Sequence, residues 1–250
     1  MIEVINVSKT FNDKKVLKSV SANFEQGQVT MVIGRSGSGK TVMLKSIIGL
    51  KTPDEGQILY NKRDFFHANL KQQREIRKEM GMVFQGSALF TSSNVEENVM
   101  FPLNLFTEMT KAEKIERVNF CLKRVNIEKA NKLYPAELSG GMQKRVAIAR
   151  AIVLNPKYLF CDEPNSGLDP QTAIVIDRLI KEITQEYNIT TIVNTHDMNS
   201  IMETADKIYF IYEGNIEWTG KNTEIFNSDN KNLNDFVFAS ELFKKIKKLE

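Results

Sequence analysis

The stretch GRSGSGKT, residues Gly34–Thr41, decides the fold of this chain. It follows an apolar run, Val29–Ile33, that is typical of a short buried strand, and it precedes Val42–Leu50, whose apolar residues recur at helical spacing. Strand, glycine-rich turn and helix in this order match the phosphate-binding pattern G-x-x-x-x-G-K-[ST] at every fixed position. We therefore predict a site for a nucleoside triphosphate. Its residues are Gly34, Arg35, Ser36, Gly37, Ser38, Gly39, Lys40 and Thr41.

The residue types in this stretch suit the binding of phosphates. The glycines allow the backbone to curl so that successive N–H groups point at an anion. The following helix adds its unpaired N-terminal donors and the positive end of its dipole. We expect Lys40 to reach the β- and γ-phosphates and Thr41 to place its hydroxyl on Mg²⁺. A glycine-rich turn that only connects two elements would not require the Lys-Thr pair.

The composition is that of an ordinary soluble globular protein, with 42% hydrophobic and 26% charged residues among 250. The formal charge of +3 is too small to indicate a nucleic-acid partner. No run of 18 apolar residues occurs, and the N-terminus lacks the features of a signal peptide, so we expect a cytoplasmic protein. Cys121 and Cys161 lie in apolar settings and are expected to pack in the core.

Strands that alternate with helices around the phosphate loop predict an α/β fold, with a P-loop NTPase core and a mostly parallel sheet. Ile2–Val7 and Val16–Phe24 alternate apolar and polar residues, which predicts a small antiparallel β subdomain. Charged helical patterns predict a helical subdomain at about 86–155; in it, Thr110 and Glu113 form an expected capping box. The predicted division is an ATP-binding domain at 1–220 and a C-terminal extension at 221–250.

Two adjacent carboxylates follow another apolar strand, which ends in Asp162 and Glu163. We expect Asp162 to hold Mg²⁺ through water, and Glu163 to act as a general base or to orient the attacking water. An acidic pair at a strand end could also cap the following helix, although the presence of Lys40 and Thr41 makes that interpretation minor. Phe11, upstream of the phosphate loop, is either an adenine-stacking ring or a hydrophobic plug under a hairpin, and the sequence barely separates the two.

The order and approximate spacing of six motifs resemble the nucleotide-binding domain of ATP-binding-cassette (ABC) proteins, over nearly the whole chain. The motifs are GRSGSGKT, Gln85, LSGGM at Leu138–Met142, YLFCDE ending at Glu163, SGLD at Ser166–Asp169, and His196. LSGGM is the most specific of them, because simple P-loop ATPases and GTPases have no such motif. The resemblance implies an ATPase with ATP and Mg²⁺ as cofactors.

The resemblance also implies roles for single residues. Phe11 matches the adenine-stacking aromatic, Gln85 the residue that senses Mg²⁺ and the attacking water, and His196 the histidine that contacts the γ-phosphate. Two cassettes of this family pair head to tail, so that each ATP lies between one phosphate loop and the partner's LSGGM segment. The residues implied for contact with the second copy are Ser139, Gly140, Gly141 and Asp169. Asn165-Ser166-Gly167 departs from the family pattern, since many cassettes have a different pair before Leu168-Asp169.

Three segments resemble the Mla-type phospholipid-trafficking ATPases of this family: 86–103, 194–203 and 229–238. This resemblance implies an integral membrane permease and a lipid-binding protein of the mammalian-cell-entry type as partners. It places the chain on the cytoplasmic side of the inner membrane, with no nucleic-acid partner. The alternative is the ATPase subunit of an importer for a small solute such as an amino acid. Cassettes that act on ribosomes or DNA carry a second cassette or a long coiled coil, and neither is present. The three site residues Gln85, Glu163 and His196 argue against a binding-only module.

Two surface hypotheses complete the prediction. Leu89, Phe90, Val95, Phe101 and Leu105 cluster after Gln85, and we expect Leu89 and Phe90 to face a helix of the permease, although some of the five must form the local core. The basic amphipathic stretch Glu241–Glu250 is consistent with a membrane-surface helix or with a helix packed on a neighbouring subunit.

Overall fold

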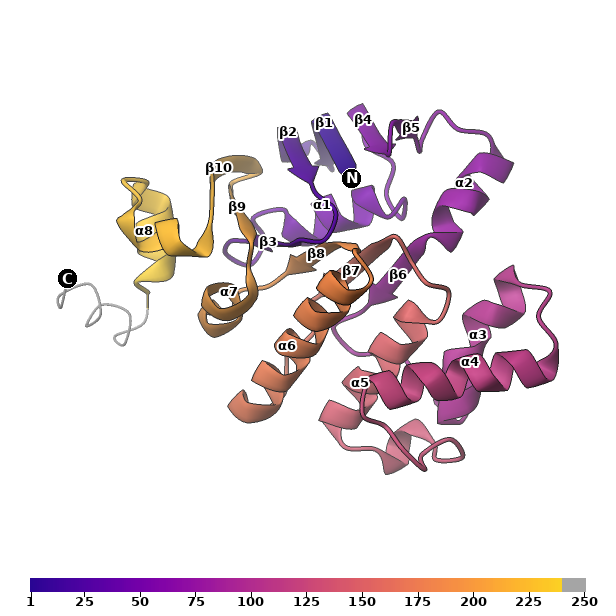
Figure 1. Cartoon of the computed structure of the whole chain (residues 1–250). Coiled ribbons are helices and arrows are strands. Elements are labelled where there is room, and N and C mark those ends of the chain that lie inside the picture. The colour runs from indigo at the N-terminus through magenta and orange to yellow at the C-terminus, as the bar shows by residue number, and fades with distance from the viewer. Residues whose placement is uncertain (240–250) are drawn as a thin grey trace.

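The computed structural model describes residues 1–239 and contains two sheets with helices around them (Figure 1). The expected amphipathic stretch Glu241–Glu250 lies outside the described residues. Both the P-loop NTPase core and the separate antiparallel sheet expected from the sequence are present. Within residues 1–239, none of the helices has the length and apolar character needed to cross a bilayer.

The smaller sheet has four antiparallel strands in the order β2-β1-β4-β5, namely β1 (Ile2–Phe11), β2 (Lys14–Phe24), β4 (Glu55–Tyr60) and β5 (Arg63–Asp64). β1 is longer than the alternating pattern predicted, because its pairing with β2 continues to Phe11 opposite Lys14. Asn12 and Asp13, both with positive φ, form the two-residue turn. Positive φ at both central residues matches the right-handed twist of a hairpin.

The larger sheet has six strands in the order β10-β9-β3-β8-β7-β6. Its strands are β3 (Val29–Ile33), β6 (Met80–Val83), β7 (Tyr158–Asp162), β8 (Thr190–Asn194), β9 (Lys207–Tyr212) and β10 (Asn215–Gly220). All of these pairs are parallel except β9 with β10. Val32 pairs with Asn194, and Asn194 pairs with Asp162, so the carboxyl ends of β3, β8 and β7 lie side by side.

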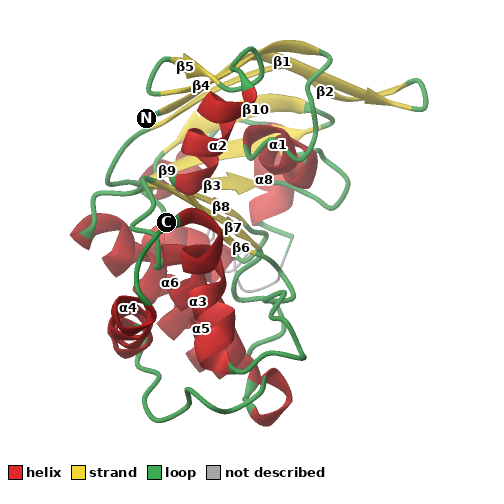
Figure 2. Ribbon diagram, turned by 90° about the vertical axis from the view of Figure 1, so that its right-hand side faces the viewer, coloured by secondary structure: helices red, strands yellow, loops and turns green. Residues whose placement is uncertain are grey.

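Helices fill the space between the sheets and cover the far face of the larger sheet (Figure 2). The α-helices are α1 (Lys40–Ile47), α2 (Leu70–Lys78), α3 (Val95–Phe106), α4 (Lys111–Arg124), α5 (Gly140–Ile152), α6 (Pro170–Glu186), α7 (Met198–Thr204) and α8 (Lys231–Val237). Two short 3-10 helices, η1 (Pro135–Glu137) and η2 (Asn222–Asn227), complete the elements. The capping box expected at Thr110 is present at the start of α4.

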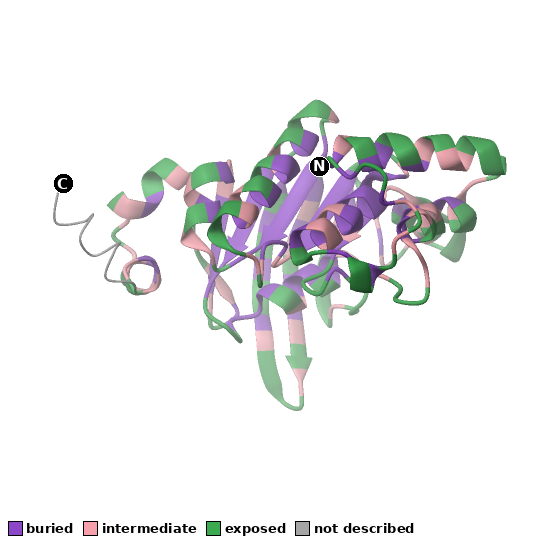
Figure 3. Ribbon diagram, turned by 90° about the horizontal axis from the view of Figure 1, so that it is seen from below, coloured by how far each residue is buried: buried purple, intermediate pink, exposed green. Residues whose placement is uncertain are grey.

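The central strands of the larger sheet are buried (Figure 3). The alternation of side chains along β3 divides the interior into two cores. Val32 packs with α1 and the smaller sheet, whereas Met31 and Ile33 pack on the opposite face with α5 and α6. Cys121 and Cys161 are buried in the second of these cores, as expected. Burial raises the pKa of both thiols, that of Cys121 to about 11, so neither position favours a reactive thiolate.

The C-terminal extension shares the main core, because α8 buries Leu233 and Val237 in the same apolar cluster as the larger sheet. Phe236 stacks near Phe210 of β9, with ring centroids 5.6 Å apart. The described part of the extension therefore has no separate hydrophobic core. The division of the chain at residue 220 stays a prediction.

Candidate functional site

A cavity of about 380 Å³ lies where β3, β7 and β8 end, and its volume is within the range of small-molecule binding sites. In open α/β sheets, ligands bind outside the carboxyl ends of the strands. This cavity is lined by Val16, Ser36, Gly37, Gly39, Lys40, Thr41, Val42, Gln85, Asp162, Glu163 and His196. The fold thus brings together the phosphate loop, the strand-end carboxylates, Gln85 and the histidine.

The phosphate loop has the curled backbone that the pattern requires. Gly34, Gly37 and Gly39 have φ values of 145°, 78° and 115°, a region that L side chains rarely adopt. A Cβ at Gly34 would lie 2.3 Å from the carbonyl oxygen of Ile211, so a larger residue would displace the loop from β9. At Gly37, by contrast, a Cβ would meet nothing within 4 Å, which leaves open space on the side of the cavity.

The first backbone N–H groups of α1 have no side-chain cap, unlike those of the other described α-helices. Its N-cap is Gly39, and no side chain accepts a hydrogen bond there. The other seven α-helices in the described part of the chain each have a side-chain cap, contributed by Asn69, Asn94, Thr110, Ser139, Asp169, Asp197 and Asn230. The first N–H groups of α1 therefore remain available to a phosphate.

Lys40, the first residue of α1, spans the loop. Its Nζ atom donates to the carbonyl oxygens of Gly34 at 2.7 Å and Arg35 at 3.2 Å. Burial lowers the pKa of Lys40, and the nearby carboxylates Glu163 and Asp162 oppose that shift. The ammonium group is thus held at the floor of the cavity, within the field of the acidic pair.

The strand-end residues are held by short polar contacts. Asp162 Oδ1 accepts a hydrogen bond from Asn194 Nδ2 at 3.1 Å, and this contact orients the carboxylate at the tip of β7. Glu163 adopts the left-handed backbone conformation, with φ of 51°, and its Oε1 atom lies 2.7 Å from His196 Nδ1. The side chain of Glu163 is 16% exposed and that of His196 is 66% exposed.

The residues fit Mg²⁺ bound mainly through phosphates and water. Within residues 1–239, there is no cluster of three or more His, Cys, Asp or Glu side chains that could hold a metal ion alone. Thr41, Gln85 and Asp162 nevertheless line one cavity and offer hydroxyl, amide and carboxylate oxygens. Magnesium commonly takes few protein ligands and completes its shell with substrate phosphates and water.

The segment that follows Gln85 is attached to α5, the helix that begins at the LSGGM motif. Lys144 donates to the Gln85 carbonyl, and Arg150 donates to the carbonyls of Ser87 and Ala88, both at 2.8 Å. Ser87 and Ala88 have positive φ, and the hydrogen bonds from Lys144 and Arg150 on α5 stabilise this backbone conformation. Movement of α5 would therefore carry the Gln85 segment with it.

Eight predicted site residues do not line this cavity: Gly34, Arg35 and Ser38 of the phosphate loop, and Phe11, Ser139, Gly140, Gly141 and Asp169. Phe11 is only partly buried, which disfavours the hydrophobic plug, and Lys9 and Lys51 lie over its ring at 5.4 and 5.7 Å. Ser139 caps α5 and Asp169 caps α6, so the cap of α6 is not the Asp162–Glu163 pair. A Cβ at Gly141 would lie 2.6 Å from Thr172 Cγ2, which places the LSGGM segment against the start of α6.

Sequence reasoning missed three residues of the site. Val16 lines the cavity from β2, Val42 lines it from α1, and Asn194 holds Asp162. Val16 reads as one more apolar residue in an alternating strand, so no pattern could have identified it. Asn194 offered a signal, because a polar residue that ends a buried β-branched strand next to the site requires a hydrogen-bond partner.

One cavity collects the phosphate loop, the acidic pair Asp162 and Glu163, and His196, while LSGGM lies at the start of α5. This combination defines the site of a cassette-type ATPase. Residues 17–166 match the family described as "ABC transporter". The methionine import ATP-binding protein MetN of Clostridium tetani is 40% identical over 97% of this chain and 76% of its own length. The probable ribonucleotide transport ATP-binding protein mkl of Mycobacterium leprae is 35% identical over 94% of this chain and 68% of its own length.

A solved structure agrees in fold with these sequence relatives. The ATP-binding cassette MJ0796, in a dimeric post-hydrolysis state bound to ADP and Pi, superposes with a TM-score of 0.80 at 34% identity, covering 89% of this chain and 99% of its own. The chain belongs to the ABC transporter ATP-binding family. It is an ABC-type ATPase with ATP and Mg²⁺ as its cofactors.

Proposed function

We propose that this chain is the ATP-hydrolysing subunit of an ABC importer for a small solute such as an amino acid. The observation that carries the proposal is the 40% identity to a methionine import ATP-binding protein over 97% of the chain. The cavity supports the ATPase part of the proposal, because it collects the loop, the acidic pair and the histidine that phosphoryl transfer to water requires.

The proposed roles of the residues follow from their positions. The phosphate loop and Lys40 bind the phosphates, and Mg²⁺, held by Thr41, Gln85 and Asp162, neutralises developing negative charge. Glu163 accepts a proton from the attacking water, and His196 keeps the Glu163 carboxylate in place while its exposed edge faces the γ-phosphate. Phe11 stacks on the adenine.

The second copy of the chain supplies the contacts that one chain lacks. Ser139, Gly140, Gly141 and Asp169 lie outside the nucleotide cavity of their own chain. In a head-to-tail dimer, the start of α5 would face the phosphate loop of the partner, where helix N-terminal donors bind anions. The related cassette MJ0796 was solved as a dimer, which supports the pairing of two copies.

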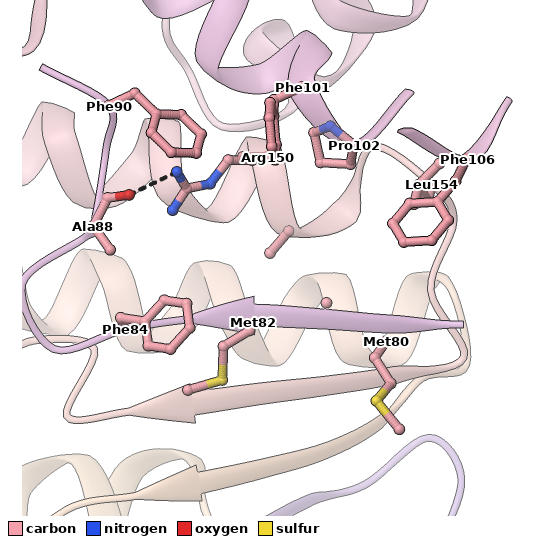
Figure 4. Close-up of a pocket in the computed structure, with 12 residues that line it drawn as sticks. Met80, Met82, Phe84, Ala88, Phe90, Phe101, Pro102, Phe106, Arg150 and Leu154 are labelled. Carbon is pink, nitrogen blue, oxygen red and sulfur yellow. Dashed lines mark hydrogen bonds between the residues drawn. The ribbon is translucent and has the colours of Figure 1, made fainter. Parts of the chain in front are cut away.

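A permease is the proposed partner for an apolar groove beside the Gln85 segment (Figure 4). The groove has a volume of about 400 Å³ and is lined mainly by Met80, Met82, Phe84, Phe90, Phe101, Pro102, Phe106 and Leu154, with Arg150 at its floor. Phe90 and Phe101 are 42% and 41% exposed, with ring centroids 4.7 Å apart. Large exposed aromatic rings around a groove fit the apolar face of a docked helix.

The structure corrects the sequence-based hypothesis for this surface. Leu89 does not line the groove, because it packs against the main core, and Val95 is fully buried there. Phe90 is exposed on the groove, as expected. A permease partner would place the chain on the cytoplasmic side of the inner membrane.

Phospholipid trafficking, with a lipid-binding partner of the mammalian-cell-entry type, is the second candidate. The three segments that resemble Mla-type ATPases favour it, and one of them, 229–238, forms α8. α8 packs on β9 and β10 through Phe236 and through a hydrogen bond of 2.8 Å from Asn232 to Glu217. The named relatives favour the importer.

The test is to purify the chain with its partners from gently solubilised native membranes and to identify proteins and lipids by mass spectrometry. Recovery of a small-solute permease, with ATP hydrolysis stimulated by an amino acid such as methionine, would support the importer. A permease with a membrane-anchored lipid-binding protein and bound phospholipid would replace it with the second candidate. Ribosomal or DNA-bound partners would contradict both.

A further inference from the structure

A buried polar cluster lies behind the catalytic residues. A cavity of about 260 Å³ extends from Glu163 and His196 towards the loop that joins β7 to α6. Three of the polar side chains that line it are almost completely buried: Asn165 is 7% exposed, Asp177 6% and Ser200 2%. They come from three separate segments, namely the loop after β7, the middle of α6 and the first turn of α7.

These three side chains form a closed set of hydrogen bonds. Asn165 Nδ2 donates to Ser200 Oγ at 2.7 Å and to Asp177 Oδ2 at 3.2 Å. Ser200 Oγ donates to the same Asp177 oxygen at 2.5 Å. A buried carboxyl is costly unless its partners are well placed. Polar side chains that hydrogen-bond to one another in the interior favour a single arrangement of the segments that contribute them.

One side of the cluster holds the loop that ends in Asp169. Within that loop, Ser166 N donates to the Glu163 carbonyl at 3.2 Å, and Leu168 N donates to the Asn165 carbonyl at 3.3 Å. Asp169 then caps α6, the helix that carries Asp177. Asn165 lies in the stretch where this sequence departs from the family pattern.

The other side of the cluster holds the segment that carries His196. Asp197, the next residue, caps α7, and its Oδ1 atom accepts from the backbone N–H of Ser200 at 3.2 Å. A continuous set of short contacts therefore runs from the Asp169 loop through Asn165 and Ser200 to the residue that follows His196.

We propose that Asn165, Asp177 and Ser200 are positioning residues that join the Asp169 loop to the His196 segment, so that both adopt their catalytic positions together. The contact of Asp169 with the second copy and the contact of His196 with the γ-phosphate then form as one event. This inference rests on the roles proposed above for Asp169 and His196. None of the three positioning residues lines the cavity proposed for the nucleotide.

The test measures steady-state ATP hydrolysis and ATP binding in the complex purified from membranes. Asp177→Ala should lower kcat about tenfold, in line with misplacement of a catalytic group, and leave the affinity for ATP within about twofold. Asp177→Asn should restore most of the kcat, because an amide oxygen can still accept from Ser200 and Asn165. Thr184→Val is the matched control: Thr184 is buried on the same helix and contacts Thr191 Oγ1 at 2.6 Å, away from both loops. It should leave kcat unchanged.

Other outcomes separate this inference from the proposed site. If His196→Ala lowers kcat and Asp177→Ala does not, the positioning role is wrong while the site stands. If Thr184→Val lowers kcat as much as Asp177→Ala, the cluster contributes only general packing. If His196→Ala leaves kcat unchanged, the site assignment itself fails. Should Asp177→Ala not fold, Ser200→Ala removes only one hydroxyl, and an unchanged kcat in that variant would contradict the proposal.

Discussion

His196 Nδ1 lies 2.7 Å from Glu163 Oε1, although the two residues follow different strands and are 33 positions apart in sequence. Adjacent parallel strands β7 and β8 produce this approach, because Asp162 pairs with Asn194 and each strand continues by one or two residues into the site. The left-handed backbone of Glu163 turns its carboxylate towards the histidine. The contact between Glu163 and His196 is therefore a consequence of the register between β7 and β8.

Glu163→Gln should lower ATP hydrolysis by roughly 100- to 10,000-fold, because an amide cannot accept the proton of the attacking water. ATP binding should persist, since the phosphate loop and Lys40 are unchanged. The measurement is steady-state release of phosphate alongside nucleotide binding. Glu108→Gln, at an exposed position between α3 and α4, is the control and should hydrolyse ATP normally. Normal hydrolysis by Glu163→Gln would show that another group accepts the proton.

Lys40→Ala should weaken nucleotide binding by roughly 10- to 100-fold, which corresponds to about 1.5–3 kcal/mol for a lost charge-assisted hydrogen bond. The variant also loses the contacts with the Gly34 and Arg35 carbonyls, so the empty loop should become less ordered. Equilibrium binding of a fluorescent ATP analogue measures the effect. Lys45→Ala removes an exposed lysine from the last turn of the same helix and should bind normally. Equal affinities in the two variants would contradict the assignment of Lys40.

Local patterns predicted the residues that lie next to one another in sequence, such as the phosphate loop and the Asp162–Glu163 pair. They could not reveal Val16, which looks like any other apolar residue of an alternating strand, and they gave no partner for Asn194, because its contact with Asp162 depends on the pairing of β7 with β8. The alternating pattern also underestimated the length of β1, because strand pairing is not visible in the local pattern. Polar residues after Val7 break the alternation, yet pairing with β2 continues past several register shifts to Phe11. The α/β fold itself followed from the order of the elements.

Phe90→Glu combined with Phe101→Glu should abolish association with the permease while leaving ATP binding unchanged. Both rings are exposed on the groove, so charge there removes its apolar character without disturbing the buried core. Co-purification from membranes measures association. Phe120→Glu on α4, a ring that is 50% exposed and does not line the groove, is the control and should co-purify normally. Retention of the permease by the double variant would place the interface on another surface.

The buried carboxyl of Asp177 should make stability depend on pH. Burial raises its pKa from 3.8 to about 6; Asp197, which caps α7, and Glu203, within α7, add to the rise, and Ser200 and Asn165 oppose it. Because the folded state binds the proton more tightly than the unfolded state, this contribution to stability is full below about pH 4 and is lost as the pH rises through about 6. A difference of about two pKa units corresponds to about 3 kcal/mol at most. Relative to Asp177→Asn, which has no proton to lose, the wild-type protein should become less stable between about pH 5 and about pH 7.5. Urea denaturation of both proteins measures this difference, and parallel stability curves over that range would show that Asp177 does not change its protonation on unfolding.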